Sequence, residues 1–227
     1  MVKKRRLFRT IALLLMTVFL LAFLVFSLLY LNAQRQPEFY RELMKRNIEI
    51  EERYHRDFLR KISQLHNTVQ KTDSPWETQI TADELNGYLA TELIKPDVHL
   101  FPKEGQEPRI RFSQQKIEWA CRLEYGSLTG ILNVAANIMV LEPNTFLLCI
   151  VQSRLGSLPF SKERTANLFA EGLRKKGYSV TMGTNSGNPA LTVTIPPIKY
   201  EGDKKITIDS LHFTDDTVQF SGRTTKE

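Results

Sequence analysis

Two pairs of adjacent carboxylates, two cysteines and two histidines are the residues of this sequence most able to carry chemistry. They are Asp83-Glu84, Asp215-Asp216, Cys121, Cys149, His55 and His66. Paired carboxylates can perform general acid–base catalysis, thiols can act as nucleophiles or form disulfides, and histidines can bind metal ions or transfer protons. Each of these chemistries requires a particular spacing of the side chains.

The spacing that catalysis or metal binding requires is absent from these groups. His55 and His66 lie eleven residues apart, whereas two metal ligands on one helix are separated by three or four residues. Adjacent carboxylates in a turn or at a helix start usually serve solvation or capping. The sequence also lacks a glycine-rich phosphate loop, a GxSxG elbow, an HExxH helix and paired CxxC motifs. We therefore expect a protein that is not an enzyme, with no catalytic residue, cofactor or metal.

The excess positive charge of the chain is concentrated at its N-terminus. The formal net charge is +6, but five basic residues within Lys3–Arg9 precede the first carboxylate at Glu38. The rest of the chain holds 26 basic and 25 acidic residues. Because a nucleic-acid-binding domain carries a basic face of its own, we expect no nucleic-acid partner.

An uncharged apolar segment follows this basic cluster. Residues 10–31 form a run of 22 residues without a charge, enough for a helix of about 33 Å, which matches a hydrocarbon core of about 30 Å. Lysines and arginines beside such a span stay on the cytoplasmic side. The sequence therefore predicts a single-pass protein of the cell membrane. Residues 1–9 would be cytoplasmic, residues 10–31 would contact the lipid bilayer, and the rest would be extracytoplasmic.

Two other interpretations of the apolar segment remain open. A cleaved signal peptide has an apolar region of about 7–15 residues and small residues before its cleavage site. This segment is longer, and Leu31 stands where a small residue is required. A buried helix of a soluble domain is the third interpretation. The length of the segment favours an uncleaved signal anchor.

A long amphipathic helix is expected after the anchor, over residues 37–71. Pro37 suits the first position of a helix, and no glycine or proline interrupts the residues that follow it. Apolar residues recur at intervals of three, four or seven, which places them in one stripe. They are Phe39, Leu43, Ile50, Tyr54, Phe58, Ile62, Leu65 and Val69. A continuous helix would form a stalk of about 50 Å.

This stripe requires a covering surface. The candidates are the chain's own domain, a second copy in a homo-oligomer, a helix of a membrane partner, and lipid headgroups. Steps of four dominate the spacing, so a strict 3.5-residue coiled-coil repeat is not kept. The sequence leaves the choice between these covers open.

The remaining residues, 76–227, are expected to form one extracytoplasmic α+β domain. Thr81 and Glu84 have the spacing of a capping box, in which each residue bonds the other's backbone at a helix start. A second helix is expected over residues 161–176, where apolar residues recur with helical periodicity and a glycine follows three basic residues.

Strands account for most of the rest of this domain. Residues 117–125 alternate strictly between apolar and polar side chains, as in a half-buried strand. Two longer apolar runs, 128–141 and 145–154, complete an antiparallel meander, and four short strands are expected after the second helix. The combined length of these three runs implies long, curved strands. The predicted fold is therefore a curved antiparallel sheet packed on one or two helices, preceded by the transmembrane and amphipathic helices.

The two cysteines have two candidate states. Cys121 and Cys149 both lie in apolar strand patterns, where buried free thiols are the expected state. A disulfide is the alternative, since the domain is expected outside the cytoplasm, where oxidation is permitted. In a simple meander one strand would separate them by about 9.5 Å, which is too far for a disulfide.

Three short motifs of the domain resemble those of a known family. Gln79–Leu89 reads QITADELNGYL, Leu155–Phe160 reads LGSLPF, and Ile206–Gly222 reads ITIDSLHFTDDTVQFSG. They resemble the T-x-x-E-L-N-x-Y-L helix start, the lG-x-L-p-x-P turn and the C-terminal strand pattern of the YpmS-like membrane-anchored bacterial proteins. Phe160-Ser161 stands where the turn would have its second proline. The resemblance spans roughly residues 76–223; it implies an architecture and supplies no catalytic residues.

Binding of a lipid or another apolar ligand is the first functional hypothesis. Envelope domains with a curved sheet wrapped on a helix bind lipids in an apolar groove, so this hypothesis is an analogy. The groove-lining candidates are Trp119, Tyr125, Ile138, Leu148 and Phe169. The same side chains could instead fill the core, where aromatic and aliphatic residues usually lie.

An envelope scaffold or accessory protein is the second hypothesis. Its amphipathic helix would pair with a membrane partner, and its domain would contact envelope polymers or a transporter. An apolar cavity of several hundred Å³ would favour lipid binding, whereas a packed core with an exposed apolar patch would favour the scaffold.

Overall fold

The computed structural model describes residues 2–70, 74–92, 105–113, 116–125, 128–196, 198–200 and 204–226, without the side chains of residues 2–13, 74, 125, 128 and 198–200. The helices in these ranges are α1 (Val2–Ala33), α2 (Glu38–Leu43), α3 (Ile48–Val69), α4 (Ala82–Glu92) and α5 (Lys162–Lys175). The strands are β1 (Ser74–Thr81), β2 (Gly105–Ser113), β3 (Lys116–Tyr125), β4 (Leu128–Glu142), β5 (Thr145–Leu155), β6 (Leu158–Pro159), β7 (Ser179–Asn185), β8 (Asn188–Thr194), β9 (Ile198–Tyr200), β10 (Lys204–Phe213) and β11 (Thr217–Lys226).

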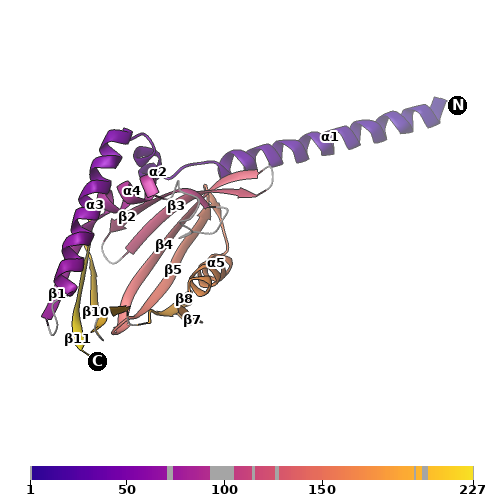
Figure 1. Cartoon of the computed structure of the whole chain (residues 1–227). Coiled ribbons are helices and arrows are strands. Elements are labelled where there is room, and N and C mark those ends of the chain that lie inside the picture. Colours follow the sequence, from indigo (N-terminus) through magenta and orange to yellow (C-terminus); the bar gives the residue numbers. More distant parts are fainter. Residues whose placement is uncertain are drawn as a thin grey trace.

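Two antiparallel sheets form the folded domain (Figure 1). The larger sheet has the order β2-β3-β4-β5-β8-β7, with the short strand β6 paired to β5. The smaller sheet has the order β1-β11-β10-β9. Helix α5 packs against β5, β7 and β8, and helix α4 packs against β2. The larger sheet is curved and unclosed, so the predicted α+β fold, with a curved antiparallel sheet packed on helices, is confirmed.

Helix α1 projects away from this domain (Figure 1). Its stretch Leu14–Ala33 is long and apolar enough to cross a membrane by length and composition, and none of it is buried within the protein. It is the one helix with these properties among the described residues. A signal sequence near an N-terminus would meet the same criteria. The apolar segment thus forms a single helix that is exposed over most of its length, as either an anchor or a signal sequence requires.

The expected continuous stalk over residues 37–71 is wrong, because the segment forms two helices, α2 and α3. The buried residues of α2 are Phe39, Tyr40 and Leu43. They pack on the face of the large sheet that carries Ala120 and Ile131. The chain turns after α2 because α2 packs against the large sheet, whereas α3 packs against α4 and β1. One straight helix would not make both contacts. No glycine or proline marks the turn, so the sequence pattern gave no sign of it.

Helix α3 packs against the domain instead of projecting from it. Its N-cap is Asn47, whose side-chain oxygen accepts a hydrogen bond from the backbone N–H of Glu49 at 3.2 Å. The helix contacts α4 and β1 along its length. Val69 is buried there, while Ile50 and Ile62 stay exposed. The chain's own domain therefore covers part of the apolar stripe.

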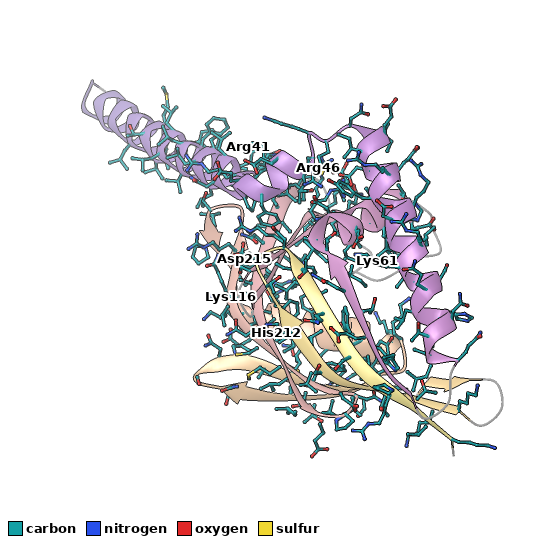
Figure 2. The ribbon with its side chains drawn as sticks, turned by 90° about the vertical axis from the view of Figure 1, so that its left-hand side faces the viewer. Arg41, Arg46, Lys61, Lys116, His212 and Asp215 are labelled. Atoms are coloured by element: carbon teal, nitrogen blue, oxygen red, sulfur yellow. The ribbon has the colours of Figure 1, made fainter. Side chains whose placement is uncertain are left out.

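Helices α3 and α4 cross at a very short distance at Gly87. A Cβ atom at Gly87 would lie 2.6 Å from the backbone nitrogen of His55 and 2.7 Å from the backbone oxygen of Glu51. Along the same interface Lys61 of α3, labelled in Figure 2, donates a hydrogen bond to Glu84 of α4 at 2.8 Å. Because no Cβ fits between the backbones, this crossing requires a glycine.

The capping box expected at the start of α4 is confirmed. The backbone N–H of Thr81 donates to Oε2 of Glu84 at 2.8 Å, and the backbone N–H of Glu84 donates to Oγ1 of Thr81 at 3.1 Å. Glu84 thus serves both the helix start and the contact with Lys61. This pair of adjacent carboxylates, Asp83-Glu84, is structural: Asp83 forms an ion pair with Arg46 at 2.7 Å.

Two buried asparagines join elements through backbone groups. Asn86 of α4 is fully buried, and its side chain donates to the backbone oxygen of Ile110 at 2.7 Å and accepts from its N–H at 2.8 Å. It thereby provides hydrogen-bond partners for the backbone of β2, the edge strand of the large sheet. Asn144, at a φ of 61° in the β4–β5 turn, accepts from the N–H of Ile208 of β10 at 2.7 Å. Asn144 therefore links the two sheets.

Both cysteines are buried free thiols. Cys121 of β3 pairs in register with Leu132 of β4, and Cys149 of β5 pairs with Asn137 of β4. Strand β4 therefore lies between the two thiols, as the meander predicts. The free-thiol state is the one in the structure.

Candidate apolar ligand pocket

A pocket of about 640 Å³ lies where the end of α1 meets the large sheet and α5. Helix α1 contributes Phe26, Leu29, Tyr30 and Ala33 to its lining. Apolar lining residues of the sheet and the α5 region include Trp119, Cys121, Leu123, Leu132, Leu158, Phe160, Leu168 and Phe169. The volume falls in the range of small-molecule sites, about 300–1,000 Å³.

The alternation of β3 positions one wall of the pocket. Trp119, Cys121 and Leu123 occupy every second position and thus share one face of the strand. The ring of Phe169 from α5 meets the Trp119 ring edge to face, with centroids 4.0 Å apart. Ser161 is the N-cap of α5, and its hydroxyl accepts a hydrogen bond from the backbone N–H of Arg164 in the first turn. The strand and the helix therefore hold the two rings together.

The turn Leu155–Phe160 holds the end of α1 against the sheet. The N–H of Ser157 donates to the backbone oxygen of Asn32 at 2.9 Å. Gly156 has a φ of +60°, and a Cβ atom there would lie 2.5 Å from the backbone oxygen of Ala33. Only glycine permits both this conformation and this approach. The apolar helix is therefore docked on the domain and completes the pocket wall.

The structure separates the predicted groove residues into two groups. Trp119 and Phe169 are in contact and line the pocket. Ile138 and Leu148 are half-buried and pack against the main core, and neither is among the residues that line the pocket. The side chain of Tyr125 lies outside the described residues.

Sequence reasoning missed the contribution of α1. Phe26, Leu29, Tyr30 and Ala33 were assigned to the membrane span alone, because an apolar run does not indicate which of its residues contact the domain. The glycine of the LGSLPF motif was the available signal, since a turn glycine often marks a close backbone approach. That signal does not name the approaching segment.

The polar groups of the pocket are few. Glu124, Thr129, Thr165 and Arg164 lie in the lining. The hydroxyl of Thr165 is already bonded to Ser153 at 2.7 Å. No three His, Cys, Asp or Glu side chains come together as metal ligands would in the described part of the chain. The lining thus suits an apolar ligand with a few oriented polar contacts.

The thiol of Cys121 is a poor nucleophile in this setting. Burial raises its pKa to about 12, because the hydrogen bond that Trp119 could donate to a thiolate offsets only part of the desolvation. At neutral pH the thiol is therefore almost wholly protonated, and thiol chemistry requires the thiolate.

Comparison of the chain with protein-family models, curated proteins and solved structures finds no match. The resemblance to the YpmS-like family therefore stays a prediction that rests on the three motifs.

A second group of titratable residues lies at the junction of α2, α3 and β2. Glu51 of α3 is only 3% exposed, and neither carboxylate oxygen has a hydrogen-bond partner among the described residues. Burial raises the pKa of Glu51, and the positive charges of Arg109 and Arg46 offset part of this rise. Arg46 is labelled in Figure 2, beside the start of α3. This group packs the junction and adjoins no pocket described above.

Glu51→Gln is expected to raise the free energy of unfolding at pH 7 by up to about 1 kcal/mol, because the neutral amide removes the desolvated charge but remains a buried polar group without a hydrogen-bond partner. The raised pKa means that the folded state holds the Glu51 proton more tightly than the unfolded state. Stability therefore falls as pH rises from the unfolded-state pKa through the folded-state pKa. Thermal unfolding of the full chain in mild detergent, at pH 7 and at pH 4, measures both effects.

The increase in the free energy of unfolding that Glu51→Gln causes should be smaller at pH 4, where Glu51 is mostly protonated in both the folded and the unfolded state. Glu52→Gln is the matched control, since Glu52 is exposed on the same helix and its pair with Arg56 at 3.9 Å contributes little. An equal stabilisation by Glu51→Gln at pH 7 and pH 4 would show that the buried charge of Glu51 does not destabilise the protein.

Proposed function

We propose that this protein is a single-pass membrane protein whose extracytoplasmic domain binds the hydrocarbon chain of a lipid. The observation that carries the proposal is the pocket of about 640 Å³ whose wall includes residues Phe26, Leu29, Tyr30 and Ala33 of the apolar helix. With α1 in a bilayer, the basic residues before it would stay in the cytoplasm. The pocket would then lie at the outer surface of the membrane.

The place of the pocket supports transfer of a chain from the bilayer. Exposing a lipid chain to water costs about 0.8 kcal/mol per CH₂ group. Phe26 and Leu29 belong both to the candidate membrane span Leu14–Ala33 and to the pocket lining. A chain could therefore pass from lipid to pocket along a continuous apolar surface, which avoids most of that cost.

The alternative function is a scaffold that pairs through α3 with a membrane partner or a second copy. Ile48 and Leu59 are exposed on this helix, so some apolar surface is left for a partner. One face of the helix, however, packs on α4 and β1. Lipid binding has the stronger support, because the pocket is open to a ligand, whereas the chain's own domain already covers part of the apolar stripe that a partner helix would need.

Fluorescence of Trp119 tests the proposal directly. The chain has two tryptophans, and the other, Trp76, is buried in a separate cluster with Val69 and Ile206. The full chain carrying Trp76→Phe would be placed in phosphatidylcholine vesicles whose acyl chains carry bromine. We expect bromine to quench more than half of the Trp119 emission, because a chain in the pocket contacts the indole ring.

A filled-pocket variant separates entry of the chain from mere proximity of the membrane. Leu123→Phe combined with Leu168→Phe enlarges two half-buried lining residues and should remove most of the quenching. Leu59→Phe, on the exposed face of α3, is the control and should leave it intact. Equal quenching in all three proteins, or none in any, would refute lipid binding in this pocket and leave the scaffold as the better proposal.

A further inference from the structure

Arg164 is the cationic side chain among the pocket-lining residues. It is exposed, and its guanidinium carbon lies 5.9 Å from the ring centre of Phe160, another lining residue. The ion pairs of the described residues do not include it. Its charge is therefore held at the pocket without a carboxylate partner from the described chain.

The position of Arg164 in its helix is locally unfavourable. It lies in the first turn of α5, where the helix dipole disfavours positive charge. The neighbouring cation, Lys162, is hydrogen-bonded to Asn188 at 2.7 Å. Among the described residues the Arg164 guanidinium has no hydrogen-bond or ion-pair partner, and residues that violate a local rule without compensation often serve function. An anion bound at Arg164 would benefit from both the guanidinium and the helix dipole.

Trp119 positions the apolar part of the ligand. It is 6% exposed and lines the pocket, and its ring packs against that of Phe169. The indole N–H is itself buried and lies beside the Cys121 thiol, so a ligand in the pocket meets the ring and not this donor. Arg164 is therefore the positively charged group of an otherwise mostly apolar lining.

We infer that the ligand is an amphiphile with a singly charged acidic headgroup. The acid group binds Arg164, and the hydrocarbon fills the apolar part of the pocket beside the rings of Trp119 and Phe169. Glu124, also in the lining, disfavours a second negative charge. A phosphodiester lipid of the bilayer and a free fatty acid share this chemistry. The inference rests on the proposed function and adds the class of headgroup.

Guest lipids with one brominated chain type and different headgroups test this inference. Vesicles of unbrominated phosphatidylcholine would hold a small fraction of brominated phosphatidylglycerol, diacylglycerol or fatty acid, together with the full chain carrying Trp76→Phe. We expect phosphatidylglycerol to quench Trp119 at about one-tenth of the guest fraction that diacylglycerol needs, a difference of about 1.4 kcal/mol. Native mass spectrometry of the unaltered chain with the same lipids gives an independent measure of bound lipid.

Arg164→Gln should lower the quenching by phosphatidylglycerol to the level of diacylglycerol. Arg174→Gln is the matched control, since Arg174 lies in the last turn of the same helix and bonds the backbone oxygen of Val180 outside the pocket. Quenching by the fatty acid but not by phosphatidylglycerol would support recognition of an acid group and identify the free acid as its source.

Equal quenching by phosphatidylglycerol and diacylglycerol, or an unchanged Arg164→Gln protein, would overturn the inference. That result is distinct from failure of the proposed function, which the fully brominated phosphatidylcholine vesicles detect through a lack of quenching whatever the headgroup.

Discussion

Asn86→Leu is expected to destabilise the folded domain by about 3 kcal/mol or more. The substitution keeps the size of the side chain but leaves both the N–H and the carbonyl of Ile110 without their partner. Each buried polar group left unpaired costs about 1–3 kcal/mol. The midpoint of thermal unfolding of the full chain in mild detergent should fall by roughly 6–12 °C, at about 2–4 °C per kcal/mol.

Asn167→Leu is the matched control, because Asn167 is exposed on α5. An exposed substitution of this kind usually changes stability by less than about 0.5 kcal/mol. If the Asn86→Leu protein has the same midpoint of thermal unfolding as the Asn167→Leu control, the stability of the edge strand β2 does not depend on the Asn86 side chain. The intrinsic fluorescence of Trp119, which lies opposite Ile110 in the β2–β3 register, reports local loosening of that edge.

Gly87→Ala is expected to be the second large destabilisation, by about 3 kcal/mol. Overpacking usually costs about 1–3 kcal/mol and occasionally more. The upper part of this range applies here, since the new methyl group meets the backbone of α3 at His55 and Glu51, which cannot change rotamer as a side chain would. The two helices must separate. Limited proteolysis within α3, together with thermal unfolding, would measure the effect.

Gly172→Ala offers a control of identical chemistry. Gly172 lies within α5, and no atom lies within 4 Å of the position of its added Cβ. Alanine there should stabilise the helix by up to about 1 kcal/mol through helix propensity alone. A similar gain at Gly87 would show that α3 and α4 are not in close contact.

Local patterns allowed much of the fold to be predicted. The apolar run became α1, the Thr81 and Glu84 spacing became the start of α4, and the alternation of residues 117–125 became strand β3 with one face in the core. The β3–β4–β5 meander followed because each strand pairs with its sequence neighbour. These features depend on interactions between residues close in sequence, which periodicity records.

Partners distant in sequence could not be predicted in the same way. Strand β1 was not expected, and it pairs with β11 near the other end of the chain, with Trp76 opposite Gly222. The pocket was anticipated only at Trp119 and Phe169, because its remaining wall comes from α1. Gly87 and Gly156 were visible as glycines, but a glycine does not identify the backbone that approaches it.

The short connection after α1 limits how far the domain can travel. Four residues separate the end of α1 from α2, and fully extended they would span at most about 14 Å. Both flanking helices are held, α1 by the turn at Gly156 and α2 by burial against the sheet. If α1 crosses a bilayer and the domain binds lipid as proposed, the domain would therefore stay at one height above that membrane. It could then present a lipid to a partner at the membrane surface, but it could not carry one to a distant membrane.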